Sequence, residues 1–454
     1  MAAIQLPALF ADGMVLQQKT AIAIWGQAAP HEQLKIISDW NKRPINVYAD
    51  GDGAWLARIQ TPQAGGPYSL TVASGKDSVT FTDVWIGEVW LCSGQSNMEF
   101  PLANQGKWKT GVENDEQEIA AAHYPFIRMF NVAHAAAKTP VQDVAGRWEV
   151  CTPETAGHFS AVAYYFARKI TQETGYPIGI IHASWGGTPA ESWVKKRVWQ
   201  QTVVPDLRLE DIQQPWSSKT PTALYNGMIA PLIPFTISGV VWYQGESNAD
   251  RPEAYKRLFP ALINSWRTDW QSDFPFYFVQ IAPHYQKNPF IREAQLYTFE
   301  CVKNTGMVVV TDAADSLDIH PRNKRIPGER LARWALAQVY GKKIAYSGPI
   351  YRSMKIEGNK IRLFFDYACG LTARGGSLKE FVICGADQLF VPAIATIENN
   401  TILVYSNQIT KPLAVRFAWK NYPRPNLYNC AGLPASPFRT DQWKKGEVHS
   451  KMGG

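Results

Sequence analysis

The sequence predicts an α/β protein with a doubly wound, mostly parallel sheet and accessory β-sandwich domains at its N- and C-terminal ends. Three observations support this fold class: short β-rich segments fill residues 1–83, strands alternate with helices over 84–340, and β character returns over 341–454. Regular alternation of strands and helices is typical of a parallel sheet covered by helices on both faces. Because 454 residues are too many for one hydrophobic core, we expect these three segments to be separate domains.

Composition and charge describe a globular protein. Hydrophobic residues make up 46% of the chain, charged residues 19%, and the formal net charge is +7. There is no run of five like charges, so the sequence gives no support for nucleic acid or a membrane as a partner. No apolar run reaches the roughly 18 residues of a membrane span. The six cysteines form no metal-type Cys-x-x-Cys pair, and one or two disulfides are compatible with their spacing.

The N-terminal segment predicts a small β-sandwich. Clusters of Gly, Pro and Asp separate its short apolar runs. The strand candidates are 14–16, 21–25, 34–37 and 68–72. None of these residues suggests catalysis, so we expect this domain to pack against the next one or to shape a substrate cleft.

The central segment opens with an apolar strand, Val84–Cys92, followed by the polar turn Ser93–Asn97. A small-residue turn at the end of a buried strand is where α/β proteins display a nucleophile. Free backbone N–H groups at the start of the next segment can stabilise an oxyanion. We therefore take Ser96 as the candidate nucleophile and its N–H as a candidate oxyanion donor. An ordinary Ser/Asn turn is the alternative, and Cys92 fits an inert core thiol.

The rest of the central segment continues the alternation after a stretch, 101–157, that we expect to be irregular. The expected helices are 160–174, 253–270, 290–303 and 323–340, and the expected strands are 178–182, 237–243, 276–281 and 307–311. Ligands of doubly wound sheets bind outside the carboxyl ends of the strands. Since each polar turn follows a strand, we expect the turns at Ser96, Gly186, Gln244 and His320 to meet at one edge.

The C-terminal segment returns to short apolar runs. The strand candidates are 361–365, 381–383, 402–405 and 414–419. We expect a second sandwich, or strands that complete the first.

The loop after the last central strand contains the candidate base. A serine is a weak nucleophile that needs a base, and the base needs a carboxylate to fix its tautomer. His320 and a nearby Asp on the same loop can provide both, with Asp318 as the orienting acid and Asp315 as its alternative. Two other interpretations stay open: a solvated acidic loop, and a metal site formed by Asp312, Asp315, Asp318 and His320.

Two further turns contain candidate oxyanion donors. Gly186 or Gly187 can let a backbone N–H approach a substrate closely. Gln244 and Asn248 carry amide N–H groups without a titrating charge. Glu246 between them fits a structural role, and plain polar turns are the alternative for both segments.

Three motifs in this order resemble the sialate O-acetylesterase family of SGNH hydrolases. They are Gly94-Gln95-Ser96-Asn97-Met98, Trp242-Tyr243-Gln244-Gly245-Glu246-Ser247-Asn248 and Asp318-Ile319-His320-Pro321. The resemblance extends from about residue 5 to about residue 440. It implies an SGNH hydrolase-like fold and an esterase that removes O-acetyl groups from carbohydrates without a metal or cofactor.

The resemblance also implies roles for single residues. Ser96 matches the family nucleophile, His320 its base, Gly186 or Gly187 its backbone oxyanion donor and Gln244 its side-chain donor. One departure concerns the acid: many SGNH hydrolases place it three residues before the His, a position occupied here by Leu317.

Substrate and location stay open. The family name does not fix the sugar, because relatives act on acetylated sialic acid, xylan and other plant glycans. Its members are often exported, so we expect a periplasmic or secreted protein whose leader is absent from this chain, with a cytoplasmic location as the alternative. A non-catalytic acetyl-glycan-binding protein and a serine acyltransferase are the alternative functions, and the oligomeric state cannot be predicted.

Overall fold

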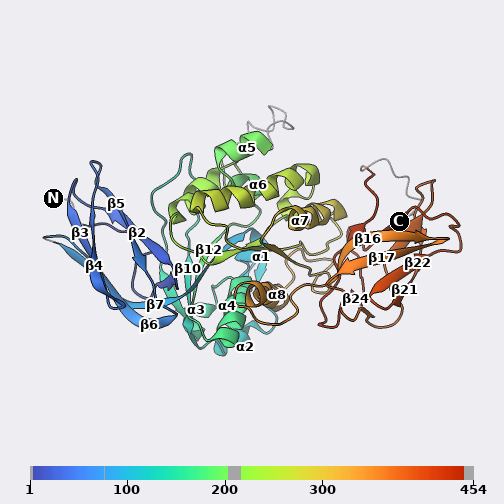
Figure 1. The fold of residues 1–454 in the computed structure, drawn as a ribbon, viewed down its shortest axis with the longest axis horizontal. Coiled ribbons are helices and arrows are strands. Elements are labelled where there is room, and N and C mark those ends of the chain that lie inside the picture. The colour runs from blue at the N-terminus through green and yellow to red at the C-terminus, as the bar shows by residue number, and fades with distance from the viewer. Residues whose placement is uncertain (1–3, 76, 203–215, 444–454) are drawn as a thin grey trace.

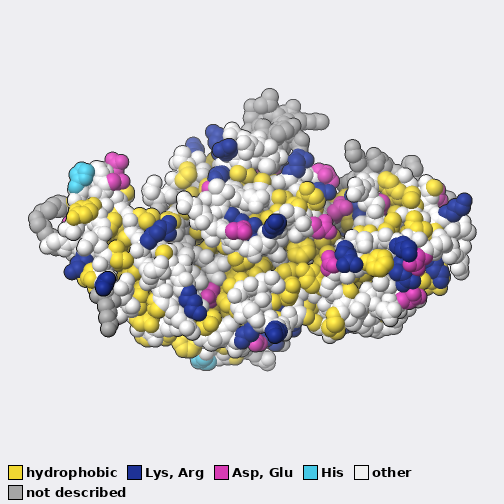
Figure 2. All heavy atoms as spheres, viewed as in Figure 1, with side chains coloured by type: hydrophobic (Ala, Val, Ile, Leu, Met, Phe, Trp, Pro, Cys, Tyr) yellow, Lys and Arg dark blue, Asp and Glu magenta, His cyan; other side chains and the backbone are white. Residues whose placement is uncertain are grey.

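The computed structural model describes residues 4–75, 77–202 and 216–443. A central domain of helices and strands lies between β-domains formed by the two ends of the chain (Figure 1). The predicted fold class is therefore confirmed. Among the described residues, no helix is both long enough and apolar enough to cross a bilayer. On the face shown in Figure 2, Lys and Arg side chains are interspersed with Asp and Glu.

The central sheet places the strand before Ser96 in its middle. Its strands are β7 (Ser78–Gly94), β10 (Tyr124–Asn131), β11 (Trp148–Cys151), β12 (Ile178–Ser184), β13 (Gly239–Tyr243), β14 (Phe276–Val279) and β15 (Thr305–Val308). Their order is β11-β10-β12-β7-β13-β14-β15, and every neighbouring pair is parallel except β10–β11. Gly94 is in register with Ser184 on one side and Tyr243 on the other. The carboxyl ends of three strands therefore meet around Ser96.

Helices cover both faces of this sheet (Figure 1). One face packs against α4 (Ala161–Thr174) and α8 (Arg325–Gln338), and the other against α6 (Pro252–Trp270) and α7 (Pro289–Cys301). The short helix α5 (Lys196–Thr202) packs on the outer side of α6. The side chain of Trp90 contacts Phe166 of α4, whereas that of Trp242 contacts Phe259 of α6. All residues of β12 and β13 are buried. Cover on both faces explains why these strands are continuous apolar runs rather than alternating ones.

Strand β7 joins the N-terminal domain to the central sheet. Its first half pairs with β1 (Val15–Gln17) and with β6 (Gly65–Ala73), and its second half pairs with β12 and β13. Beyond β6 the same sheet continues into β3 (Gln33–Ser38) and β4 (Asn41–Tyr48), and β2 (Ala21–Gln27) pairs with β5 (Ala54–Gln60) in a separate two-stranded sheet. The expected domain boundary at residue 83 lies inside β7, so the two domains share a strand.

The expectation of an irregular stretch over 101–157 was wrong. This stretch contains β8 (Asn104–Gly106), β9 (Lys109–Thr110), α2 (Asp115–Ala120), β10, β11 and α3 (Pro153–Ala156). Strand β10 was missed because Pro125 and Arg128 interrupt its apolar pattern. The guanidinium of Arg128 is buried against the Asp83 carboxylate, with Nη2 and Oδ2 3.0 Å apart, so an ion pair allows a charged residue inside this strand.

The C-terminal domain is a second sandwich. One antiparallel sheet contains β16 (Ile350–Glu357), β17 (Lys360–Asp366), β22 (Thr401–Tyr405) and β21 (Ile394–Glu398). The other contains β20 (Val391–Pro392), β19 (Phe381–Cys384), β23 (Ala414–Phe417) and β25 (Phe438–Arg439), and β18 (Thr372–Ala373) pairs separately with β24 (Leu427–Tyr428). The rings of Phe365 and Phe438 lie 5.7 Å apart between the two sheets, which shows that the layers share one core.

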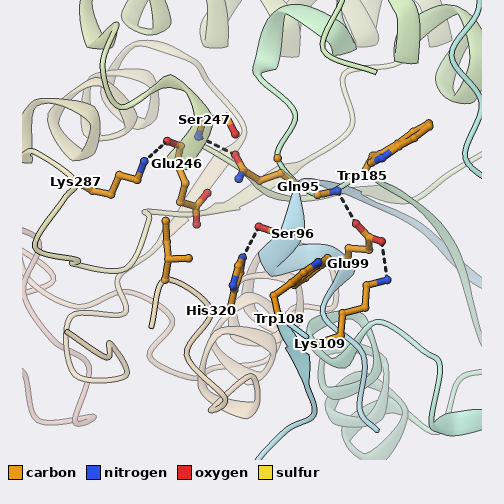
Figure 3. Close-up of a pocket in the computed structure, with 13 residues that line it drawn as sticks. Gln95, Ser96, Glu99, Trp108, Lys109, Trp185, Glu246, Ser247, Lys287 and His320 are labelled. Atoms are coloured by element: carbon orange, nitrogen blue, oxygen red, sulfur yellow. Dashed lines mark hydrogen bonds and ion pairs between the residues drawn. The ribbon is translucent and has the colours of Figure 1, made fainter. Parts of the chain in front are cut away.

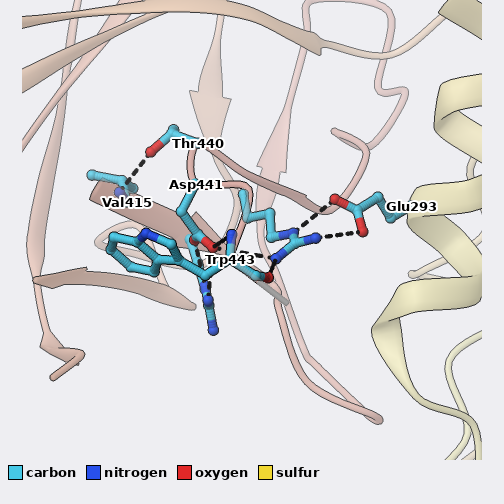
Figure 4. Close-up of polar contacts among 7 residues, drawn as sticks. Glu293, Val415, Thr440, Asp441 and Trp443 are labelled. Carbon is cyan, nitrogen blue, oxygen red and sulfur yellow. Dashed lines mark hydrogen bonds and ion pairs between the residues drawn. The ribbon is translucent and has the colours of Figure 1, made fainter. Parts of the chain in front are cut away.

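An ion-pair network fixes this domain against helix α7 (Figure 4). Arg439 on β25 binds both carboxylate oxygens of Glu293 on α7, at 2.7 and 3.0 Å. The buried Asp441 carboxylate accepts hydrogen bonds from Arg439 and from Arg416. A bidentate guanidinium–carboxylate pair is geometrically specific, so it fixes the orientation of the C-terminal domain on the central one.

Candidate active site

The turn that carries Ser96 depends on a glycine. Strand β7 ends at Gly94, and helix α1 (Ser96–Glu99) begins two residues later. Gly94 has a φ of +139°, and a Cβ at this position would lie 2.2 Å from the carbonyl oxygen of Tyr243. The N–H of Gln95 donates to the same carbonyl at 2.9 Å. A glycine is therefore required for the chain to turn so close to β13 and to place Ser96 at the sheet edge.

The structure brings Ser96 and His320 together from positions 224 residues apart. The Oγ of Ser96 and the Nε2 of His320 are 2.9 Å from each other. This distance allows the imidazole to take the hydroxyl proton directly.

The two candidate acids lie on the same loop in different roles. The Oδ1 of Asp318 is 3.7 Å from the Nδ1 of His320, close enough for an ion pair but longer than a hydrogen bond. The same oxygen accepts the backbone N–H of His320 at 2.7 Å. Asp315 instead accepts the backbone N–H groups of Leu317 and Asp318. Of the two carboxylates, the structure therefore places Asp318 beside the imidazole, and Asp315 shapes the loop.

Ser96 and His320 open into a pocket of about 650 Å³ (Figure 3). Two aromatic side chains, Trp108 and Trp185, line it. The ring of Trp108 lies 4.9 Å from that of His320, and Trp185 stacks on His134 at 4.1 Å. Aromatic walls together with several polar and charged side chains suit a small polar ligand, and the size of the pocket is sufficient for a sugar ring with an attached acyl group.

The predicted oxyanion donors lie in two different places. Gly186 and Gly187 line the pocket beside Ser96. The N–H of Gly186, however, donates to the Oε2 of Glu99 at 2.5 Å, which leaves Gly187 as the neighbouring backbone donor.

Gln244 and Asn248 lie beneath the pocket and do not line it. The Nε2 of Gln244 donates to the Oδ1 of Asn248 at 2.7 Å and to the carbonyl of Thr188 at 3.3 Å. The amide of Asn248 also donates to Glu191 and accepts the N–H of Ala190. Both amides thus hold the turns after β12 and β13 together. Neither amide presents an N–H group to the position of the oxyanion.

The structure adds Gln95 and Glu99 to the pocket, two residues that the sequence analysis missed. The Oε1 of Gln95 accepts the backbone N–H groups of Gly245 and Ser247 at 3.4 and 3.2 Å, which fixes its amide at the pocket wall. Glu99 pairs with Lys109, with 2.8 Å between Oε1 and Nζ. For Glu99 the spacing from Ser96 is a sequence signal, since residues three apart share a helix face, whereas Gln95 directly precedes Ser96 in the turn.

Burial controls the protonation of the groups around the serine. It lowers the pKa of His320 to about 4, and the charge of Lys324 acts in the same direction, whereas Asp318 and Glu99 oppose it. The imidazole is therefore neutral and able to accept a proton at neutral pH. Burial also raises the pKa of the Cys92 thiol, so this cysteine stays protonated and unreactive.

The metal alternative gains no geometric support. In the described parts of the chain, no group of three or more His, Cys, Asp and Glu side chains is arranged to hold a metal ion. Asp312, one of the four candidate ligands, binds Arg330 through both carboxylate oxygens at 2.7 Å.

Comparison with known proteins identifies the family. Residues 86–337 match the family model described as carbohydrate esterase, sialic acid-specific acetylesterase. The chain belongs to this family. The sialate O-acetylesterases of Pongo abelii and Homo sapiens are each 31% identical to it, over 94% of this chain and 90% of theirs. A carbohydrate acetylesterase from Xanthomonas citri superposes with a TM-score of 0.88 at 37% identity, covering 97% of this chain and all of its own.

Membership of the acetylesterase family confirms the resemblance that the three motifs indicated. The match covers all but the ends of the central domain, and the full-length relatives extend it over both β-domains. The chain is thus a carbohydrate esterase of the type that acts on acetylated sugars.

The low pKa of His320 predicts an unusually acid-tolerant esterase. Only the neutral imidazole can accept a proton, and its pKa is lowered to about 4 in the folded protein. Activity should therefore be constant from neutral pH down to about 5 and fall as the pH drops through about 4. The measurement is kcat/KM on 4-nitrophenyl acetate against pH, with circular dichroism to confirm folding at each pH. An acid limb near 6.5, the ordinary pKa of histidine, would contradict this description of the site.

Proposed function

We propose that this chain releases acetate from O-acetylated carbohydrates by ping-pong acyl transfer through Ser96. The observation that carries the proposal is the 2.9 Å contact between the Ser96 hydroxyl and the His320 imidazole inside an aromatic pocket. Family membership supports the acetylated sugar as substrate class.

The first half-reaction forms an acetyl-enzyme. His320 Nε2 takes the proton of Ser96 while Oγ attacks the acetyl carbonyl carbon. The tetrahedral intermediate collapses with cleavage of the bond to the sugar oxygen, and His320 returns the proton to that oxygen. In the second half-reaction, His320 deprotonates a water that attacks the acetyl group on Ser96, and acetate leaves.

Asp318 stabilises the imidazolium that forms in both steps. Its carboxylate lies 3.7 Å from Nδ1 and is fixed by the backbone N–H of His320. A negative charge at this distance favours the protonated ring in the transition state. It acts through charge, because the structure contains no hydrogen bond from Nδ1 to this carboxylate.

The oxyanion is held by N–H groups at the pocket wall. We assign the backbone N–H groups of Ser96 and Gly187 and the side-chain amide of Gln95 to this role. Gly187 replaces Gly186 because Glu99 already accepts the Gly186 N–H. Gln95 replaces Gln244 because it lines the pocket and is anchored through its carbonyl, which leaves its NH₂ group for a ligand.

The identity of the acetylated sugar is tested by a direct comparison of substrates. Trp108 and Trp185 offer aromatic faces to any pyranose ring, whether a sialic acid or a unit of a plant glycan such as xylan or xyloglucan. Initial rates of acetate release from acetylated forms of these three substrates, at equal acetyl concentration, rank them directly.

The substitution Ser96→Ala should lower kcat by at least about 1,000-fold without loss of folding, the scale observed for triad nucleophiles. The matched control is Ser93→Ala on β7, the strand that leads to Ser96. The buried hydroxyl of Ser93 has no hydrogen-bond partner in the structure, and Ser93 does not line the pocket. The measurement is kcat on 4-nitrophenyl acetate. Activity of Ser96→Ala close to that of the unaltered chain would exclude the serine mechanism.

A further inference from the structure

A buried polar cluster lies beside Ser96 and has no role in the steps above, although one of its members, Glu246, also lines the pocket. It consists of Asn97, Glu246 and Lys324, with exposed fractions of 0%, 4% and 1%. The Nδ2 of Asn97 donates to the Oε1 of Glu246 at 2.6 Å, and the Nζ of Lys324 donates to the Oδ1 of Asn97 at 2.5 Å. One amide therefore bridges a buried carboxylate and a buried ammonium group.

The cluster also reaches the loop that carries the base. The Nδ2 of Asn97 donates a second hydrogen bond, at 3.1 Å, to the carbonyl of Ile319, the residue before His320. Lys324 lies at the start of α8, four residues after His320, and its Nζ is 4.5 Å from the centre of the Phe100 ring. The nucleophile turn, the turn after β13 and the His320 loop are thus joined at one side chain, Asn97.

We propose that Asn97, Glu246 and Lys324 form a buried clamp that positions the His320 loop against Ser96 and places a lysine charge near the imidazole. The inference rests on the proposed function and deepens it. Isolated buried charges are costly, and a charge left without its partner costs more than the pair contributes. A cluster of this kind next to a nucleophile is therefore better explained by positioning than by stability.

The charge effect follows from the groups that surround the imidazole. Lys324 on α8 and His284 on the loop after β14 disfavour the charged ring, whereas Asp318 on its own loop and Glu99 on α1 favour it. Burial lowers the pKa of Lys324 to about 7, with Glu246 and Asp318 opposing. Lys324 is consequently charged near pH 4, so its positive charge is present in the pH range in which His320 becomes protonated.

Two variants separate the tether from the charge. Asn97→Ala removes the hydrogen bond to the His320 loop and keeps the lysine, so kcat should fall about 10- to 100-fold with the acid limb of kcat/KM unmoved. Lys324→Met removes the positive charge, so the acid limb should move upward by about one pH unit. The measurement is the pH profile on 4-nitrophenyl acetate, with Lys355→Met, an exposed lysine of the C-terminal domain, as the control.

The outcomes distinguish the clamp from the mechanism it serves. Retained activity in Ser96→Ala would overturn the serine mechanism itself. An inactive Ser96→Ala together with unchanged kcat in Asn97→Ala and an unmoved acid limb in Lys324→Met would overturn the clamp alone. If Lys324→Met does not fold, Lys324→Gln tests the same point, because it also removes the charge but keeps a hydrogen-bond donor for Asn97, and the acid limb should again move upward.

A second inference concerns Cys369 and Cys430 in the C-terminal domain, both exposed thiols in this structure. The backbone N–H of Cys430 donates to the carbonyl of Cys369 at 2.8 Å. A Cβ placed on Gly370 would lie 2.9 Å from the Cβ of Cys430. The neighbouring Cys430 thiol raises the pKa of Cys369. The pairing of β18 with β24 fixes this arrangement.

We infer that Cys369 and Cys430 are a disulfide-forming pair that links the segment before β18 to the segment after β24. With oxidised glutathione as the oxidant, a Sγ–Sγ bond forms, the glutathione disulfide is reduced to two thiols, and those thiols take up the two protons that the cysteines lose. A link of this kind fits the periplasmic or secreted location that we expect.

The test is thiol counting on the full chain after equilibration with oxidised glutathione. Alkylation in denaturant should label four cysteines instead of the six that the sequence contains, and peptide mapping should recover a linked peptide that holds both partners. The midpoint of thermal unfolding should rise by about 3 °C or more, and dithiothreitol should reverse the change. Cys369→Ser should abolish the effect and Cys301→Ser should preserve it. Full alkylation of Cys369 and Cys430 after oxidation would overturn the inference.

Discussion

The site depends on the close approach of two backbone segments, Gly94 and the Tyr243 carbonyl. No side chain fits between them, since a Cβ on Gly94 would lie 2.2 Å from that oxygen. This contact lets the middle strand of the sheet end in a sharp turn and start a helix at Ser96. Every other part of the site is arranged around that point: the pocket opens over it, the His320 loop closes on it, and the clamp of Asn97, Glu246 and Lys324 lies beside it.

The fold explains why residues so distant in sequence can be positioned this accurately. Strand β7 is held on both sides by parallel neighbours and is covered on both faces by helices, so its end is rigid. The same strand continues into the N-terminal sheet, and Arg439 fixes the C-terminal sandwich on α7. Both β-domains thereby brace the catalytic sheet, so Ser96 is held at the end of a rigid strand. The His320 loop is tied to this point by the hydrogen bond from Asn97 to the carbonyl of Ile319.

Outside residues 101–157, the sequence was sufficient to predict most of the alternating strands and helices of the central domain. It also predicted the meeting of Ser96, His320 and the Gly186 turn, because parallel strands place their carboxyl ends at one edge. Hydrogen-bond partners could not be predicted in this way. Gln244 and Asn248 both have side-chain amides, and the local sequence does not reveal that these two amides are hydrogen-bonded to each other. Glu99 accepts the hydrogen bond of the Gly186 N–H although the two residues are 87 positions apart in the sequence. Lys324 precedes a helix, where lysines are ordinarily solvated, and its burial follows only from the tertiary fold.

The central claim is that Ser96 is activated by His320, and covalent labelling tests it most directly. A 4-nitrophenyl phosphonate ester reacts with a serine only where a base and an oxyanion site activate it. We predict that inactivation proceeds in step with a single adduct, that peptide mapping places the adduct on Ser96, and that His320→Ala prevents it. Complete inactivation with the adduct on another residue, or equal labelling of Ser96 in the His320→Ala chain, would contradict the account.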